Sequence, residues 1–200
     1  MTSEAVDAAA DRAKAAGLVL MAADYPSGWK VETHPSDPSE RDTDRRFAAC
    51  VGLPDPDSVQ TVDVPGPDAT TGEFVQAGSD ATFYRQATQA RDQVAAADSP
   101  KFLPCAKQEI TRLLQDQQLT VQSVDVERLA VQRYGEAAAG LRAIAKVTAN
   151  GTSTTIYYDS VQMVKGRLTL GVTFSNVGQP FDPALERSLI AKAGAKIEAA

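Results

Sequence analysis

Along the last third of the chain, apolar residues occupy every second position, which is the period of a half-buried β-strand. One such segment covers residues 141–149 and another covers residues 168–174. Asn150-Gly151 is the preferred residue pair of a type I′ hairpin turn, and Lys165-Gly166 predicts a second tight turn. With residues 154–164 as the middle strand, this pattern predicts a meander of antiparallel strands.

Helical patterns surround the predicted meander. Asp182-Pro183 begins a terminal helix whose apolar residues recur at helical spacing, so we expect this helix to pack across the sheet. Hydrophobic residues make up 43% and charged residues 23% of the 200 residues, which are ordinary values for a globular protein. The chain therefore reads as a single α+β domain over residues 18–200, an antiparallel sheet covered by helices, preceded by an N-terminal helix or linker over residues 1–17.

The other expected elements follow from capping residues and periodicity. A helix at residues 3–16, capped by Ser3, has a face made mostly of alanine and is expected to bury little. The remaining expected helices cover residues 37–52, 86–97 and 99–114, and the remaining strands cover residues 59–64, 74–84 and 119–131, the last with a bulge.

The two cysteines, Cys50 and Cys105, stand beside helix-boundary residues and not in a C-x-x-C motif. If they lie at the ends of neighbouring helices, one disulfide closes a loop of about 56 residues and stabilises the fold by about 4 kcal/mol in the chain-entropy model. The alternative is a pair of buried free thiols. We favour the disulfide, and with it an oxidising, extracytoplasmic compartment.

Charge is distributed unevenly along the chain. Residues 1–99 carry 17 acidic and 8 basic residues, whereas residues 100–200 carry 9 acidic and 12 basic residues. Nucleic acid is not expected as a partner, because its binding needs a dense basic face. No apolar run approaches the roughly 20 residues that span a bilayer. The N-terminus also lacks the features of a secretion signal, as a mature domain without its leader would.

One catalytic motif has a partial match. Ser27-Gly28-Trp29-Lys30 fits S-x-x-K, in which a serine at the start of a helix lies one turn from its lysine, but Pro26 and Gly28 favour a turn here. His34 is the only histidine and falls in a Pro-rich loop, so neither a histidine-based metal site nor a Ser-His-Asp triad is expected. No glycine-rich phosphate-binding motif is present, and no cofactor or metal is expected.

Aromatic residues make up only 6% of the chain, so the position of each is informative. Tyr157 and Tyr158 are consecutive on an expected strand, so one side chain should point inward and the other outward. The outward tyrosine and Trp29, which follows a tight turn, are candidates for a binding surface. Alternatively, Trp29 anchors the N-terminal segment on the core.

Several segments together resemble a known group of proteins. They are Leu18-x-Leu20-x-x-Ala23-Asp24-x-Pro26-x-Gly28-Trp29, Ala48-Ala49-Cys50-x-Gly52 with Cys105, and Val161-x-x-Val164-Lys165-Gly166-Arg167-Leu168 with Phe174 and the helix at residues 185–190. These segments are similar to secreted or lipid-anchored domains of actinobacterial cell envelopes, in particular the extracellular sensor domains of actinobacterial receptor Ser/Thr kinases. The resemblance implies helices over an antiparallel sheet, a structural disulfide, a binding role outside the membrane and no catalytic residues. The chain differs from the kinase sensor domains, which have two disulfides, in having only two cysteines.

We therefore predict a non-catalytic extracytoplasmic binding domain of a cell-envelope protein. It would hold a small or apolar ligand on a concave sheet face or in a helix–sheet cleft, with Trp29, Tyr157 and Tyr158 as candidate contacts. One alternative is a protein-interaction module whose acidic N-terminal half docks a basic partner. Another is a serine hydrolase that uses Ser27 and Lys30.

Overall fold

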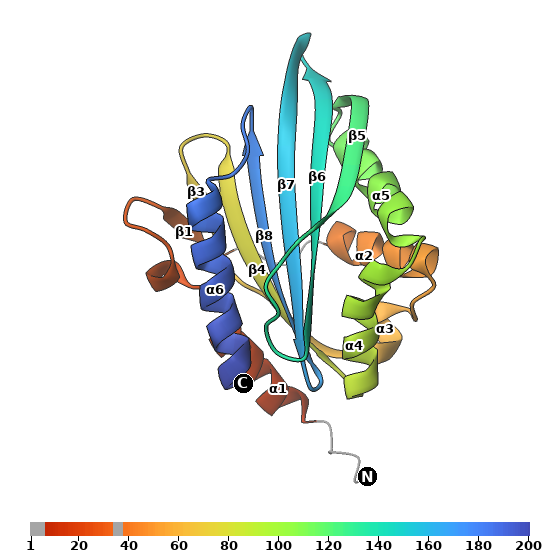
Figure 1. Cartoon of the computed structure of the whole chain (residues 1–200), viewed down its shortest axis with the longest axis vertical. Coiled ribbons are helices and arrows are strands. Elements are labelled where there is room, and N and C mark those ends of the chain that lie inside the picture. The colour runs from red at the N-terminus through yellow and green to blue at the C-terminus, as the bar shows by residue number, and fades with distance from the viewer. Residues whose placement is uncertain (1–6, 34–37) are drawn as a thin grey trace.

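The computed structural model describes residues 7–33 and 38–200. Within them, eight strands form one antiparallel sheet in the order β1-β3-β4-β8-β7-β6-β5, and β2 also pairs with β4 (Figure 1). This confirms the predicted α+β class. The strands are β1 (Lys30–Glu32), β2 (Gln60–Pro65), β3 (Asp68–Thr71), β4 (Val75–Tyr84), β5 (Thr120–Leu129), β6 (Ala137–Ala149), β7 (Thr152–Lys165) and β8 (Leu168–Val177).

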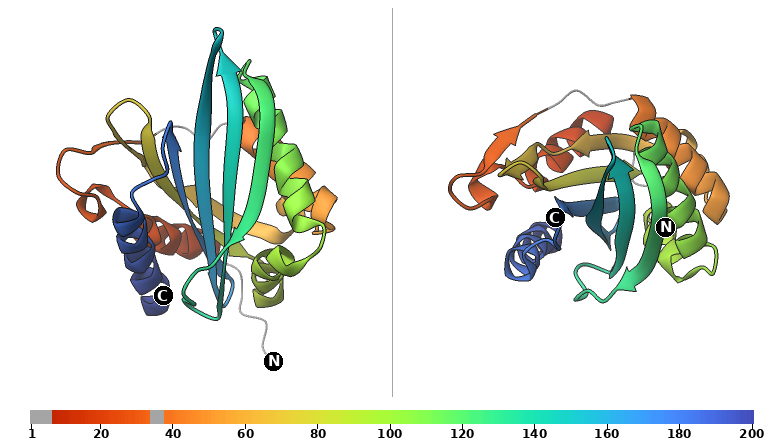
Figure 2. Two further views of the ribbon diagram at one scale, coloured as in Figure 1. Left: turned by 45° about the horizontal axis from the view of Figure 1, so that its top comes forward. Right: turned by 90° about the horizontal axis from the view of Figure 1, so that it is seen from above.

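Helices lie on both sides of the sheet (Figures 1 and 2). On one side, which we call the front face, α6 packs against β7 and β8, and α1 lies beside the lower end of α6. On the opposite side, the back face, α4 and α5 pack against the sheet, and α2 packs on α5. The helices are α1 (Ala8–Leu18), α2 (Pro38–Val51), α3 (Pro56–Val59), α4 (Ala87–Ala95), α5 (Phe102–Asp116) and α6 (Pro183–Ala199), with short 3-10 helices at η1 (Ala22–Asp24) and η2 (Ala96–Asp98).

The predicted C-terminal meander is confirmed, since β5, β6, β7 and β8 are consecutive antiparallel neighbours. Asn150 and Gly151 both have positive φ, 50° and 78°, as a type I′ turn requires. The second turn was predicted one residue too early. Lys165 pairs with Leu168 and is the last residue of β7, so the turn consists of Gly166 and Arg167, with Gly166 at φ 58°.

Two short strands were not predicted. β1 has three residues and β3 has four, too few to show a period-two pattern, and they pair with each other next to β4. The first helix also differs from the prediction, because α1 is capped by Asp7, which accepts hydrogen bonds from the backbone N–H groups of Ala9 and Ala10. The predicted cap, Ser3, lies outside the described residues.

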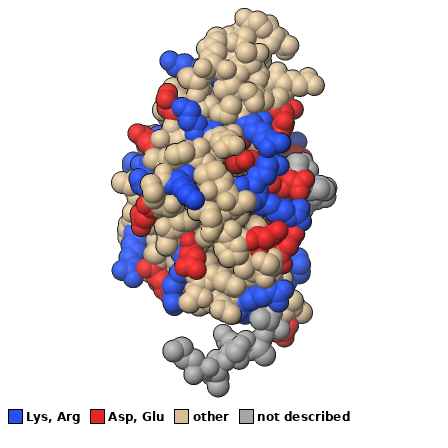
Figure 3. All heavy atoms as spheres, turned by 90° about the vertical axis from the view of Figure 1, so that its right-hand side faces the viewer, with Lys and Arg blue, Asp and Glu red and all other residues tan. Residues whose placement is uncertain are grey.

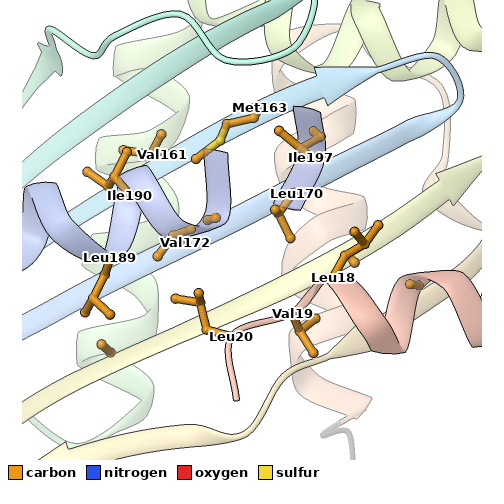
Figure 4. Close-up of a cluster of buried hydrophobic side chains, with 14 of the residues drawn as sticks. Leu18, Val19, Leu20, Val161, Met163, Leu170, Val172, Leu189, Ile190 and Ile197 are labelled. Carbon is orange, nitrogen blue, oxygen red and sulfur yellow. The ribbon is translucent and has the colours of Figure 1, made fainter. Parts of the chain in front are cut away.

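The main core lies between the front face and α6 (Figure 4). Asp182 caps α6 and Pro183 occupies its first turn, as predicted. Alternate residues of β7 and β8 point towards this helix because side chains of a strand alternate between faces. The buried side chains of this interface are Val161, Met163, Leu168, Leu170, Val172, Phe174, Leu189, Ile190, Ala193 and Ile197.

The alanine-rich helix α1 buries more than its composition suggested. Ala15 and Leu18 join the front core, and Asp11 is buried as well. The Asp11 carboxylate accepts two hydrogen bonds from Arg167 Nη2, at 2.7 and 3.0 Å, while Arg167 Nη1 donates to the carbonyl of Tyr84. This ion pair therefore ties α1 to the turn between β7 and β8, across 156 residues of sequence.

On the back face, α2 is joined to α5 by the predicted disulfide between Cys50 and Cys105. The two Cα atoms lie 5.9 Å apart, and both cysteines of the chain are used. Next to the disulfide, Arg46 Nε donates to the Glu109 carboxylate at 2.9 Å, and Glu109 is buried. The disulfide and this ion pair hold α2 on the outer side of α5.

The Asp11→Asn variant tests the ion pair of α1. Breaking a buried pair leaves the Arg167 guanidinium enclosed without its counter-ion, so we expect the free energy of unfolding, measured by urea denaturation, to fall by about 3 kcal/mol. Asp116→Asn on the exposed end of α5 is the matched control, with an expected change within about 0.5 kcal/mol. Equal effects of the two variants would contradict this role of Asp11.

The disulfide closes a loop with a sequence separation of 55 residues. The Cys50→Ala, Cys105→Ala double variant should lose about 4 kcal/mol of unfolding free energy, because its unfolded chain is no longer cross-linked. Urea denaturation of the double variant, and of the wild-type protein after reduction, should give the same lowered midpoint. An unchanged midpoint in both would show that the cross-link does not stabilise the fold.

Candidate binding surface

Trp29, which precedes β1, belongs to a row of four aromatic rings. Its ring stacks on Tyr25, with 5.6 Å between centroids, and contacts Phe181 at 6.1 Å. Phe181 in turn contacts Phe174 of β8 at 5.0 Å. Trp29 is half-buried and the other three rings are buried. These are the contacts of an anchor that packs the N-terminal segment on the front core.

Tyr157 and Tyr158 lie on opposite faces of β7. Tyr157 shares the front face with Val161 and Met163, whereas Tyr158 points to the back face. Both rings are half-buried, so the expected contrast between an inward and an outward tyrosine is weak. Burial raises the pKa of Tyr158 to about 12, although a hydrogen bond with Ser160 opposes this shift. Trp29 therefore shares a face with Tyr157 and not with Tyr158.

A small cavity lies on the back face, between α4, the start of α5 and the strands β6 and β7. Its volume is about 50 Å³, and it is lined mainly by apolar side chains such as Val94, Phe102 and Leu141. Pockets that enclose small molecules have volumes of roughly 300 Å³ or more. This helix–sheet cavity is thus too small to enclose the ligand that we expected there.

The S-x-x-K residues do not have the geometry of the catalytic motif. Ser27 lies in an exposed turn, where the Trp29 N–H donates to the Pro26 carbonyl, and it does not begin a helix. Lys30 lies on β1, and its ammonium group forms an exposed ion pair with Glu32 at 2.9 Å. His34, the other residue considered for catalysis, lies outside the described residues.

Part of the front face is left without a covering helix. In Figure 1, α6 lies in front of the half of the sheet that contains β4 and β8. The segment between β5 and β6 passes in front of the lower part of the sheet. Tyr134 of this segment packs tightly on Gly194 of α6. Above it, the residues of β5, β6 and β7 that point to the front are half-buried or exposed. We call this surface the open face; it consists of Asp125, Arg142, Ile144, Lys146 and Tyr157, which neighbour one another through the strand pairs.

A charged pair forms the lower border of the open face. Arg142 on β6 and Asp159 on β7 are cross-strand partners. Arg142 Nε and Nη2 donate to the two carboxylate oxygens of Asp159 at 2.8 and 2.7 Å, and Asp159 is 6% exposed. Such bidentate pairs are strong and directional, so Arg142 is held flat against β7.

Glu186 lies close to this pair, on the helix α6 that packs over β7 and β8. It is 6% exposed, and its carboxylate forms no hydrogen bond or ion pair with any residue that the structure describes. Burial raises the pKa of Glu186, and the nearby Asp159 carboxylate raises it further, while Arg142 and Arg187 oppose the shift. Glu186 is therefore a buried acid with an unsatisfied charge at the edge of the open face.

Sequence reasoning did not single out Arg142, Asp159 or Glu186. The sequence contained one signal for Arg142 and Asp159. A two-residue turn at Asn150-Gly151 pairs residues whose numbers sum to 301, which places Arg142 opposite Asp159. No comparable signal exists for Glu186. Its position next to Asp159 depends on how α6 docks, which residue spacing along the chain does not specify.

The acidic residues of the N-terminal half are largely engaged within the protein. Besides Asp11, Asp24 pairs with Lys196 at 3.0 Å, and Asp57 pairs with Arg41 and Arg45. Figure 3 shows the side that carries α5, where acidic and basic side chains are interspersed. That view contains no continuous acidic patch for a basic partner to dock on.

The described residues contain neither a metal-binding cluster of side chains nor a helix suited to span a membrane. No group of three or more histidine, cysteine, aspartate or glutamate side chains is arranged there to hold a metal ion. Across residues 7–33 and 38–200, no helix is both long and apolar enough to cross a membrane.

The Glu186→Gln variant tests the electrostatics of this acid. Because the pKa of Glu186 is raised in the folded protein, its protonated form stabilises the fold, and this stabilisation is complete below the ordinary glutamate pKa and is lost as pH rises through the raised value. Glutamine mimics the protonated acid. We expect the variant to match the wild type in melting temperature at pH 4 and to melt higher at pH 8. A lower melting temperature at pH 8 would mean that the charged Glu186 stabilises the fold.

Solved structures resemble this chain, two mycobacterial proteins among them, whereas the comparisons of sequence found no relative. No protein-family model matches the chain, and no curated protein matches it. The extracellular domain of PknH from Mycobacterium tuberculosis is 9% identical, over 100% of both chains, with a TM-score of 0.42. LpqN of the same organism, described as involved in cell envelope biogenesis, is 9% identical over 88% of this chain and 78% of its own, with a TM-score of 0.37. Both are mycobacterial envelope proteins, the class that the sequence resembles.

Proposed function

We propose that this chain is an extracytoplasmic binding domain of a cell-envelope protein and that the open face is its binding surface. The observation that carries the proposal is the open face itself: a partly apolar area of sheet, left uncovered by helices, with the unpaired Glu186 at its edge. Elsewhere on the front face, α6 and the segment before β6 cover the sheet.

The disulfide supports the extracytoplasmic part of the proposal. Disulfides form and persist in oxidising compartments and are rare in reducing ones. Cys50 and Cys105 are joined, and Cys105 is buried. With Cys105 buried and Cys50 half-buried, we assign this cross-link a stabilising role and not that of an accessible redox group.

The binding mode follows from the size of the available sites. The back-face cavity of about 50 Å³ does not enclose a small molecule. The open face, in contrast, offers Tyr157 and Ile144 as half-buried apolar contacts, flanked by the charges of Asp125 and Lys146. A ligand would thus lie across the strands, and Tyr157 would supply much of the contact area, since an aromatic ring offers a large rigid surface.

Retention of a solubilised envelope extract on the immobilised domain tests this function. Tyr157→Thr keeps a residue suited to a strand but removes the ring, so we expect about tenfold weaker retention of the bound components, as for an interface anchor. Phe74→Thr is the matched control, because Phe74 is 53% exposed and lies in the β3–β4 turn, away from the open face. The proposal fails if the wild type retains nothing, or if Tyr157→Thr and Phe74→Thr retain the same components equally well.

A further inference from the structure

The described part of the chain contains four buried carboxylates, and three of them have a basic partner. Asp11 pairs with Arg167, Glu109 with Arg46, and Asp159 with Arg142. Glu186 has none, although it is as buried as the others. Enclosing most of a carboxylate without a counter-charge is unfavourable, so a cation beside Glu186 would stabilise its charged form.

We propose that Glu186 is the acceptor for an alkylammonium group of the ligand, which binds between Glu186 and Asp159 with its carbon chain against Tyr157. This inference rests on the proposed function, because it names the chemical group that the open face recognises. Tyr157 lies two residues before Asp159 on the same face of β7, so a chain of a few carbon atoms spans from the carboxylates to the ring.

The local charge favours a cation. Three acids surround Arg142: Glu186, Asp159 and Glu127, its cross-strand partner on β5. Arg142 is already committed to Asp159 through two hydrogen bonds. Arg187 also acts on Glu186, but it lies exposed and forms no ion pair with it. With Arg142 and Arg187 set against these three acids, one further positive charge brings the group to neutrality. An ammonium group has three N–H donors, and the Glu186 oxygens are free to accept from it.

The Glu186 carboxylate also remains accessible. Among the described side chains, Tyr25 Oη is the only polar atom that is fully enclosed without a partner. The Glu186 oxygens are not in that state, so part of this carboxylate meets solvent at the edge of the open face. An ammonium group is a compact cation that can approach such an edge, whereas no group of three or more carboxylate, imidazole or thiol side chains is arranged among the described residues to hold a metal ion.

Titration with n-butylammonium chloride, followed by two-dimensional NMR at constant ionic strength, tests the inference. We expect saturable shifts at Tyr157, Asp159 and Glu186 with a dissociation constant on the order of 1 mM, which is reasonable for so small a ligand. Affinity should rise with pH as Glu186 loses its proton, because the ligand binds the charged acid. The neutral analogue n-butanol should give no saturable shifts at these residues.

Two glutamate variants complete the test. Glu186→Gln removes the acceptor charge and should weaken n-butylammonium binding by about tenfold or more, the effect of one charge-assisted hydrogen bond. Glu73→Gln makes the same change at an exposed glutamate in the β3–β4 turn and should leave binding unchanged. The inference is overturned if the wild type shows no saturable shift, or if Glu186→Gln binds as tightly as the wild type.

Failure of this inference and failure of the proposed function give different results. If envelope components are lost from Tyr157→Thr but retained by Glu186→Gln, the open face binds its ligand without an ammonium contact, and only the further inference fails. If n-butylammonium binds Glu186 but Tyr157→Thr retains envelope components normally, the open face is not the surface that holds them, and the proposed function fails.

Discussion

The register between β6 and β7 is the constraint on which the rest of the structure depends. The type I′ turn at Asn150-Gly151 aligns 13 residue pairs, from Ala149 opposite Thr152 to Ala137 opposite Val164. A slip of one residue would turn every side chain of one strand to the other face. With this register, Val161 and Met163 meet α6, and Arg142 lies opposite Asp159, so the front core and the border of the open face have the same origin.

Around this hairpin, buried polar contacts connect parts of the chain that are far apart in sequence. Asp11 and Arg167 link the first helix to the β7–β8 turn, and Arg46 and Glu109 link α2 to α5 beside the disulfide. Each pair is geometrically specific, so it stabilises one docking position of its helix over others. Hydrophobic packing alone specifies such positions less sharply, because it is not directional.

Glu186 departs from this pattern, and its position suggests why. The other buried acids join two elements of the fold, whereas Glu186 lies at the edge of a face that no helix covers. Native proteins tend to keep an unsatisfied buried group where function requires it. Glutamine or an apolar residue at position 186 would fill the same space without the repulsion between the Glu186 and Asp159 carboxylates. Packing alone therefore does not explain why an acid stands here.

Local patterns in the sequence determined the α+β class, the C-terminal meander, the terminal helix begun by Asp182 and the joining of Cys50 to Cys105. These features depend on periodicity, capping and turn residues, which act over a few neighbouring positions, and on cysteines placed at helix boundaries. Only the tertiary structure decided the pairing of the short strands β1 and β3, the burial of Asp11, and the meeting of Glu186 with Asp159. Those features depend on how α1, α6 and the edge strands dock against a twisted sheet. Contacts between residues tens of positions apart, or 156 apart for Asp11 and Arg167, leave no periodic trace in the chain.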